Sequence, residues 1–315
     1  MARLRIATLG IVALLVAACG QGGSTSSPSG AASAAPSTQA SLPPAETAVP
    51  TQDACAKDSL QTLTAGTLTV GADNPAFPPY FIPDDPKPEG SEWESGQPPN
   101  GKGLESATAY AVAEELGFTR DEVTWVVTPF NIAVQPGPKP FDMYVSQVSW
   151  KPARAERVDL SDGYFDLNQG VVAIDGTAIA DVTTVAGLKD FRLGSQSGTT
   201  SFDYITDQIA PTPEPRAYDS LNAALRALGN GQIDGLVADL PTTFYMRDVQ
   251  LDNGVIVGSL PTPAGQEIEH FSIALDKGSS LTACVNDALA ALTADGTLDA
   301  IRNDWIAGQG APALQ

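Results

Sequence analysis

From residue 66 onward, short runs of β-branched and apolar residues alternate with segments in which apolar residues recur at helical spacing. The first such pair is a strand expected over residues 66–73 and a helix that begins after Gly103 and stops at Gly117. Strands that alternate with helices are usually parallel, because a parallel neighbour is reached only through a crossover connection. The sequence therefore predicts an α/β fold in which helices cover parallel sheets.

The same alternation continues to the end of the chain. Further strands are expected in five segments: 122–127, 141–145, 191–195, 233–239 and 270–275. A helix after Ser220 places its leucines at helical spacing, and two helices after Ser279 would close the chain. At about 260 residues, the folded part is long enough for one large domain or for two smaller lobes with cores of their own.

The N-terminus has the pattern of a secretory signal peptide over residues 1–18. Arg3 and Arg5 provide the positive region, an apolar run follows, and a small-residue cleavage site ends in Cys19. The apolar run is shorter than the ~20 residues that a membrane-spanning helix needs. The cleavage site resembles a bacterial lipobox, which implies that Cys19 is lipidated and holds the protein to the cell membrane outside the cytoplasm. The alternative is an ordinary secreted protein with a chance cysteine.

Residues 19–52 consist almost entirely of Gly, Ser, Thr, Ala, Pro and Gln, and Glu46 is their only charged residue. Such a segment has too little apolar surface to offset the conformational entropy that ordering would cost. We therefore expect a disordered tether between the anchor and the folded part, which would begin at residue 53.

The charge balance restricts the partners. The chain has 17 Lys and Arg against 37 Asp and Glu, a formal net charge of −20, and no basic stripe along any segment. This disfavours nucleic acid and anionic lipid surfaces as binding partners.

Catalytic and metal-binding patterns are also missing from the sequence. His270 is the only histidine, and there is no Gly-x-Ser-x-Gly motif, no paired Cys and His spacing and no Gly-rich phosphate loop. We therefore predict a protein that is not an enzyme and that needs neither a cofactor nor a metal.

Two cysteines remain after Cys19. Cys55 lies just before the first expected strand, and Cys284 lies inside a C-terminal helix. In an oxidising compartment the two are expected to form a disulfide that ties the ends of the folded part together. The alternative is a pair of buried thiols that never meet.

Polar residues suited to a zwitterion follow three of the expected strands. Arg154 lies in the first turn of a helix that begins at Pro152, and a guanidinium can grip a carboxylate with two charge-assisted hydrogen bonds. Residues 197–200 open another helix, whose free N–H groups and the Thr200 hydroxyl offer a second carboxylate cradle. Asp239 ends a strand, where its carboxylate can accept hydrogen bonds from an ammonium.

Several segments of the chain, in order, resemble the amino-acid-binding branch of the bacterial extracellular solute-binding proteins, which are the receptors of polar amino acid ABC importers. These segments are 73–81, 101–116, 141–165, 193–205, 233–239 and 294–305, within a match over about 66–306. The resemblance implies a two-lobed fold of the type II periplasmic-binding-protein class, with lobes joined by two hinge strands. It assigns residues 53–165 and 269–315 to lobe 1 and residues 166–268 to lobe 2.

The resemblance also implies the partners and the ligand site. A monomer would trap a small amino acid or analogue between its lobes and deliver it to an ABC transporter permease. Arg154, helped by Ser149 and Thr200, would bind the α-carboxylate, while Asp239 would take the α-ammonium. The full set expected to contact the ligand is Asp73, Phe77, Tyr80, Phe130, Ser146, Gln147, Ser149, Arg154, Thr199, Thr200 and Asp239.

The chain departs from the family pattern at Gln147, Trp150 and Lys151 and carries an acidic, Pro- and Gly-rich insertion over residues 82–99. These departures bear on which amino acid is bound. Two alternatives to the importer remain: an enzyme that resembles periplasmic dehydratases on the same scaffold, and a sensory receptor that docks on a signalling partner.

Overall fold

The computed structural model describes residues 52–306 and 310–315. The expected signal peptide, the lipidated Cys19 and all but the last residue of the expected tether lie outside these described residues. No helix in the described part combines the length and the apolar character that spanning a bilayer requires.

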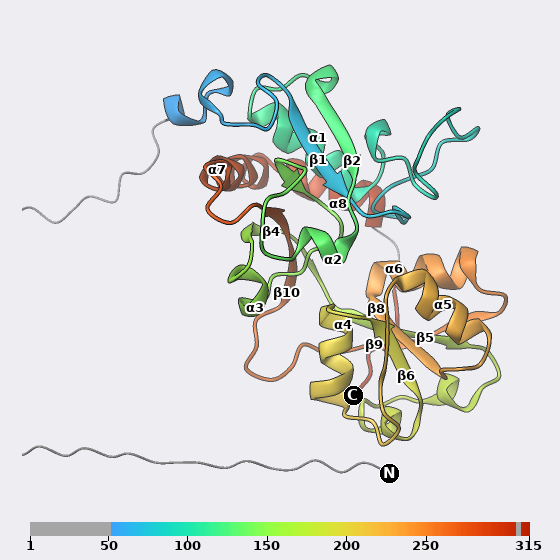
Figure 1. The fold of residues 1–315 in the computed structure, drawn as a ribbon. Helices are drawn as coiled ribbons and strands as arrows, with labels where there is room; N and C mark the ends of the chain where they lie inside the picture. Colours follow the sequence, from blue (N-terminus) through green and yellow to red (C-terminus); the bar gives the residue numbers. More distant parts are fainter. Residues whose placement is uncertain (1–51, 307–309) are drawn as a thin grey trace, which may run out of the picture. The chain divides into compact units, whose positions relative to one another are not determined.

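The first of two five-stranded sheets has the strand order β2-β1-β3-β10-β4 (Figure 1). Its strands are β1 (Leu68–Ala72), β2 (Val123–Val127), β3 (Met143–Tyr144), β4 (Asp159–Leu167) and β10 (Glu269–Leu275). β1 pairs in parallel with β2 and with β3, whereas β10 runs antiparallel to β3 and β4. The sheet is therefore mixed, because the last strand returns to it from a distant part of the chain.

Three longer helices pack on this sheet and on one another: α1 (Leu104–Glu115), α7 (Leu281–Ala294) and α8 (Thr297–Ile306). Gly103 and Gly117 bound α1 at backbone angles that suit glycine, with φ of 104° and 84°. The apolar side chains of α1 and α7 join the strands in one buried cluster. Two single-turn helices, α2 (Phe130–Ala133) and α3 (Pro152–Ala155), follow β2 and β3.

The second sheet has the order β7-β6-β8-β5-β9. Its strands are β5 (Gln169–Ile174), β6 (Leu193–Gln196), β7 (Arg216–Tyr218), β8 (Gly235–Asp239) and β9 (Gly254–Ser259). β6 is parallel to β7 and β8, and β5 is antiparallel to β8 and β9. The helices α4 (Thr200–Tyr204), α5 (Leu221–Gly229) and α6 (Leu240–Tyr245) complete this half, which has two apolar clusters of its own.

The chain passes between the two sheets at two points before its C-terminus. Only Asn168 separates β4 from β5, and residues 260–268 connect β9 to β10. The C-terminal residues 310–315 make a further connection, because Ala313 bridges to Ser259 of β9 and Leu314 is buried in a cluster of the second sheet. The sequence assignment placed these last residues with the first lobe; the structure packs them against the second sheet.

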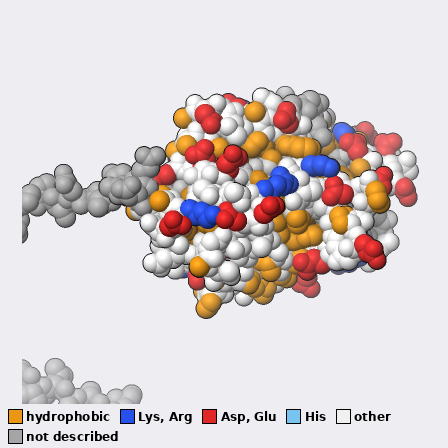
Figure 2. All heavy atoms as spheres, turned by 90° about the horizontal axis from the view of Figure 1, so that it is seen from above, with side chains coloured by type: hydrophobic (Ala, Val, Ile, Leu, Met, Phe, Trp, Pro, Cys, Tyr) orange, Lys and Arg blue, Asp and Glu red, His pale blue; other side chains and the backbone are white. Residues whose placement is uncertain are grey.

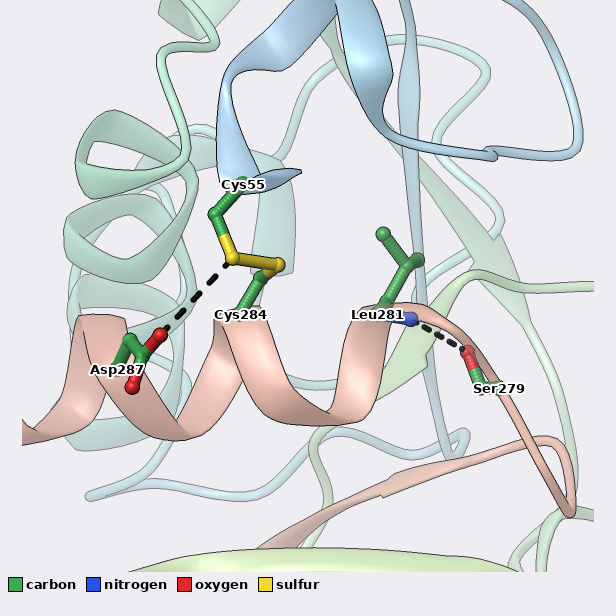
Figure 3. Close-up of a disulfide and its surroundings, with 5 residues drawn as sticks. All are labelled: Cys55, Ser279, Leu281, Cys284 and Asp287. Atoms are coloured by element: carbon green, nitrogen blue, oxygen red, sulfur yellow. Dashed lines mark hydrogen bonds between the residues drawn. A yellow bond between two sulfur atoms is a disulfide. The ribbon is translucent and has the colours of Figure 1, made fainter. Parts of the chain in front are cut away.

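A disulfide joins Cys55 to Cys284 with a Cα–Cα distance of 5.4 Å, as the sequence predicted (Figure 3). It fastens the short helix Gln52–Cys55 to α7, and the Asp287 carboxylate lies 3.9 Å from the Cys55 sulfur. At the start of α7, the Leu281 N–H donates to the Ser279 hydroxyl over 3.2 Å. The bridge therefore ties the first described turn of the chain to a helix near its end.

Carboxylates dominate the charged surface on the face that Figure 2 shows, where Asp and Glu side chains are scattered and Lys and Arg are fewer. The basic side chains on this face lie among acidic ones rather than forming a separate basic surface.

Candidate functional site

A cavity of about 210 Å³ lies among loops that follow strands of both sheets. Ten of the eleven residues expected to contact a ligand line it: Asp73, Phe77, Phe130, Ser146, Gln147, Ser149, Arg154, Thr199, Thr200 and Asp239. Most of them follow the carboxyl ends of β1, β3, β6 and β8. In open α/β sheets this edge is the usual place for a ligand, because the loops there diverge and leave a crevice.

Tyr80 is the exception. Its ring is fully buried and packs edge-on against Phe271, with ring centroids 5.7 Å apart. Its hydroxyl accepts a hydrogen bond from Thr242, which does line the cavity. Tyr80 thus lies behind the wall of this cavity, and its contact with a ligand side chain stays a prediction.

Arg154 is buried at the floor of the site, and its guanidinium is already oriented by the protein. It donates to the Ser149 carbonyl and, over 3.2 Å, to the Gly198 carbonyl, and it lies 5.2 Å from the centroid of the Phe130 ring. Burial lowers its pKa to about 10, which still leaves the group charged at neutral pH. A guanidinium has five N–H donors, and these two bonds leave others for a carboxylate.

The cradle expected at Thr199 and Thr200 is partly used within the protein. The Thr199 hydroxyl caps α4, because it accepts from the Phe202 N–H at 3.2 Å and donates to the Gln196 carbonyl at 2.8 Å. The Thr200 hydroxyl donates to Glu269 over 2.5 Å. Thr200 is therefore linked to a carboxylate that the sequence analysis did not single out.

Asp239 is held by a buried amide. Its Oδ1 accepts from the side-chain nitrogen of Gln169 at 2.8 Å, and the same nitrogen lies 2.8 Å from Glu269 Oε2. Burial and, secondarily, the charge of Glu269 raise the pKa of Asp239 to about 8. Gln169 and Glu269 were missed by sequence reasoning; the available signal was a polar residue at the first position of β5 and of β10, two largely buried strands.

Asp73 follows β1 directly and also lines the cavity. Its Oδ1 accepts from the Asn74 N–H at 2.8 Å, and its own N–H donates to the Ser146 hydroxyl at 3.3 Å. Burial raises the pKa of Asp73 to about 6, so this carboxyl is mostly ionised at neutral pH.

Gln147 holds an unusual backbone conformation, with φ of 49°. A non-glycine residue in this region costs roughly 1–2 kcal/mol, so it requires fixed partners. Glu105 of α1 supplies them: its carboxylate accepts from the Gln147 N–H at 2.6 Å, from the Gln147 side chain and from the Tyr164 hydroxyl. Burial raises the pKa of Glu105 to about 7. Sequence reasoning missed Glu105 because it reads as an ordinary helix residue.

The insertion over residues 82–99 is attached to the rim of the cavity. Asn74, a lining residue, donates to the Glu92 carbonyl and accepts from the Glu94 N–H, both at 2.9 Å. Trp93 between them is buried in the core of the first half, while Glu92 and Glu94 are exposed. The insertion therefore brings acidic side chains next to the cavity-lining loop.

Residues 68–308 match the bacterial extracellular solute-binding proteins, family 3. The chain belongs to this family. Among its relatives, the ABC transporter arginine-binding protein 1 of Escherichia coli (strain K12) is 30% identical over 52% of this chain and 66% of its own length. The L-cystine-binding protein TcyJ of the same organism is 26% identical over 76% of this chain and 82% of its own.

A solved structure, an ancestral arginine-binding protein bound to arginine, superposes on this solute-binding protein with a TM-score of 0.59. It shares 27% identity and covers 76% of this chain and 98% of its own. The predicted periplasmic-binding-protein fold is thereby confirmed. The relatives are binding proteins of transporters rather than enzymes, in agreement with the prediction of binding without chemistry.

Among residues 52–306 and 310–315, no three His, Cys, Asp or Glu side chains are grouped so that they could hold a metal ion.

The raised pKa values of Asp73, Glu105 and Asp239 predict how stability depends on pH. Above pH 4 the unfolded chain ionises these carboxyls while the native protein keeps their protons, so the native state binds more protons. The free energy of unfolding should therefore fall as the pH rises from about 5 to 8. Urea denaturation of ligand-stripped protein at several pH values measures this directly.

An Asp239→Asn variant should lose part of that pH dependence and be more stable than the wild type at pH 8, since it removes one carboxyl group whose pKa is raised in the native state. The matched control is Asp252→Asn, which changes an exposed carboxyl. If stability rises between pH 5 and 8, or if Asp239→Asn behaves like the control, the assigned pKa of Asp239 is wrong.

Proposed function

We propose that this protein is the extracytoplasmic receptor of an ABC importer and that it captures an amino acid with a polar or basic side chain. The observation that carries the proposal is that Arg154 and Asp239 line one cavity. A zwitterion that loses its water needs a fixed opposite charge at each pole, or its burial is unfavourable by several kcal/mol. Arg154 would bind the α-carboxylate and Asp239 the α-ammonium.

The charges that remain favour a polar or cationic ligand side chain. The charged residues that line the cavity are Asp73, Arg154, Asp219 and Asp239. Once Arg154 and Asp239 have bound the two poles, two carboxylates are left and no cation. The names of the relatives, an arginine-binding and a cystine-binding protein, support the same class of ligand.

The walls of the cavity would hold the aliphatic part of the ligand. Phe77 and Phe130 are both buried and both line it. In this assignment Asp73 lies at the ligand's side-chain end, where an ionised carboxyl can pair with a guanidinium or ammonium.

The dehydratase-like alternative is less well supported. An enzyme for a dicarboxylic acid would need two cations, whereas Arg154 is the one basic residue among those that line the cavity.

The two sheets are proposed to be the cores of two lobes that close on the ligand, with the β4–β5 and β9–β10 connections as hinges. The lipobox-like site at Cys19 and the tether after it would hold the receptor near the permease.

The proposed anchor is tested by a Cys19→Ala variant, which should be released into the medium or remain as an uncleaved precursor. Membrane fractionation and mass measurement distinguish these products from the mature lipoprotein. Normally processed, membrane-bound variant protein would contradict the anchor.

A thermal-shift screen of refolded, ligand-stripped protein tests the proposed function. Arginine, lysine, histidine and glutamine are expected to raise the melting temperature, because bound ligand stabilises the native state. Glutamate and aspartate should not, since their side-chain carboxylates would face Asp73 and Asp219. Stabilisation by glutamate above all others would show that the surplus negative charge does not select the ligand.

The two poles can be tested by substitution. Truncating one partner of a buried charge pair typically costs 2–5 kcal/mol, so Arg154→Ala should weaken arginine binding by roughly 30-fold to several thousandfold. Arg154→Lys should also bind poorly, because an ammonium cannot reproduce the two-pronged contact. Calorimetry with L-arginine measures both variants.

The matched control is Arg157→Ala, which removes an exposed arginine three residues further along the chain and should bind normally. Near-native affinity in folded Arg154→Ala protein would show that the carboxylate binds elsewhere.

A further inference from the structure

Two carboxylates share one amide nitrogen at the point where the chain passes between the sheets. Gln169 Nε2 lies 2.8 Å from Asp239 Oδ1 and 2.8 Å from Glu269 Oε2. The two oxygens are therefore separated by no more than twice that distance. Asp239 lines the ligand cavity, whereas Glu269 faces a second hollow on the other side of Thr200 and Gln169.

The orientation of the Gln169 amide is fixed by its neighbours. The Ser201 hydroxyl donates to Gln169 Oε1 at 2.5 Å, which leaves the NH₂ group to donate one hydrogen to each carboxylate. The reverse orientation would point the amide oxygen at two carboxylates. Thr200 donates to the other oxygen of Glu269, so both carboxylate oxygens of Glu269 accept hydrogen bonds.

Asp239 is surrounded by more negative than positive charge. The groups that act on it are Glu269 of β10, Gln169 of β5, Glu105 of α1 and Arg154 of α3. The hydroxyls of Tyr80 and of Tyr164 in β4 also face this carboxyl, and both stay protonated because burial raises their pKa values. Burial disfavours the ionised form of Asp239 most, and the negative charges of Glu269 and Glu105 add to this effect. The hydrogen bond from Gln169 and the charge of Arg154 oppose it, and the balance leaves Asp239 in a poor position to ionise when no ligand is present.

We propose that Glu269 is a positioning residue whose negative charge, held beside Asp239 by the shared Gln169 amide, keeps Asp239 in its protonated form in the empty site, so that capture of the ligand's ammonium releases that proton. This inference rests on the proposed function, in which Asp239 binds the α-ammonium. The carboxylic acid of Asp239 and the ligand ammonium become a carboxylate–ammonium pair, and one proton passes to solvent. Glu269 itself does not touch the ligand.

The proton balance fixes the sign of the pH dependence. The empty protein holds more protons than the complex, so affinity should rise with pH until the pKa of Asp239, about 8, is reached. If Asp239 is ionised throughout in the complex, the affinity for arginine should rise by at least tenfold, on the order of one factor of ten per released proton and pH unit, between pH 6 and pH 8. At pH 7.5 Asp73, with a pKa of about 6, is already ionised and contributes little.

Calorimetry with L-arginine in two buffers of different ionisation enthalpy, phosphate and Tris at pH 7.5, counts the protons released. The wild type should release a substantial fraction of one proton, because the raised pKa of Asp239 leaves much of this carboxyl protonated at that pH. Glu269→Gln keeps the shape of the side chain and removes its charge, so it should release fewer protons and show a flatter pH profile of affinity. Glu267→Gln, an exposed carboxyl two residues earlier, is the control and should match the wild type.

The wild-type measurement needs no variant, so the test does not depend on how Glu269→Gln folds. Arginine binding without proton release, or equal release by wild type and folded Glu269→Gln, overturns the inference and leaves the proposed function intact. A protein that binds no amino acid contradicts the proposed function itself, and the inference with it.

Discussion

One buried guanidinium holds together the parts on which the site depends. Arg154 donates to the carbonyl of Ser149, in the loop after β3, and to the carbonyl of Gly198, in the loop after β6. It therefore joins loops of the two sheets while keeping donors free for a ligand. Lys151, three residues earlier, adds an ion pair with Asp203 of α4 at 2.7 Å.

The contacts of Arg154 and Lys151 between the two halves are polar, whereas each sheet has apolar clusters of its own. Polar interfaces of this kind permit relative motion of the parts they join, which suits a receptor that must admit and release its ligand.

The same region concentrates carboxyl groups whose ionised forms the folded protein alone disfavours. Asp73, Asp239 and Glu105 all have raised pKa values, and burial is the largest cause for each. An arrangement that destabilises the empty protein while favouring a cationic group is typical of functional sites, where stability is given up for binding. The strained backbone of Gln147 belongs to the same arrangement, because Glu105 both fixes that residue and adds to the negative charge around Asp239.

The family resemblance implied the two-lobed fold and the aromatic walls of the cavity, whereas the α/β class, Arg154, Thr200 and Asp239 were predicted from the residues of the sequence itself. Its alternating strand and helix patterns, Gly103 and Gly117 at the ends of α1, and the polar residues after strand ends all depend on local periodicity and on the geometry of strand ends, which a single sequence displays. For the same reason Arg154, Thr200 and Asp239 were identified, since each follows directly after a recognisable element.

Which polar residues act together became visible in the folded chain. Gln169 and Glu269 are 100 residues apart, and their shared contact exists because β5 and β10 begin at the two places where the chain crosses between the sheets. Tyr80, which the family resemblance placed at the ligand, has its ring in the core, and Glu105 was missed because a buried glutamate on a helix has no local signature. Burial and the distances between side chains from remote elements set the pKa values and hence the chemistry of the site, and these are properties of the folded chain alone.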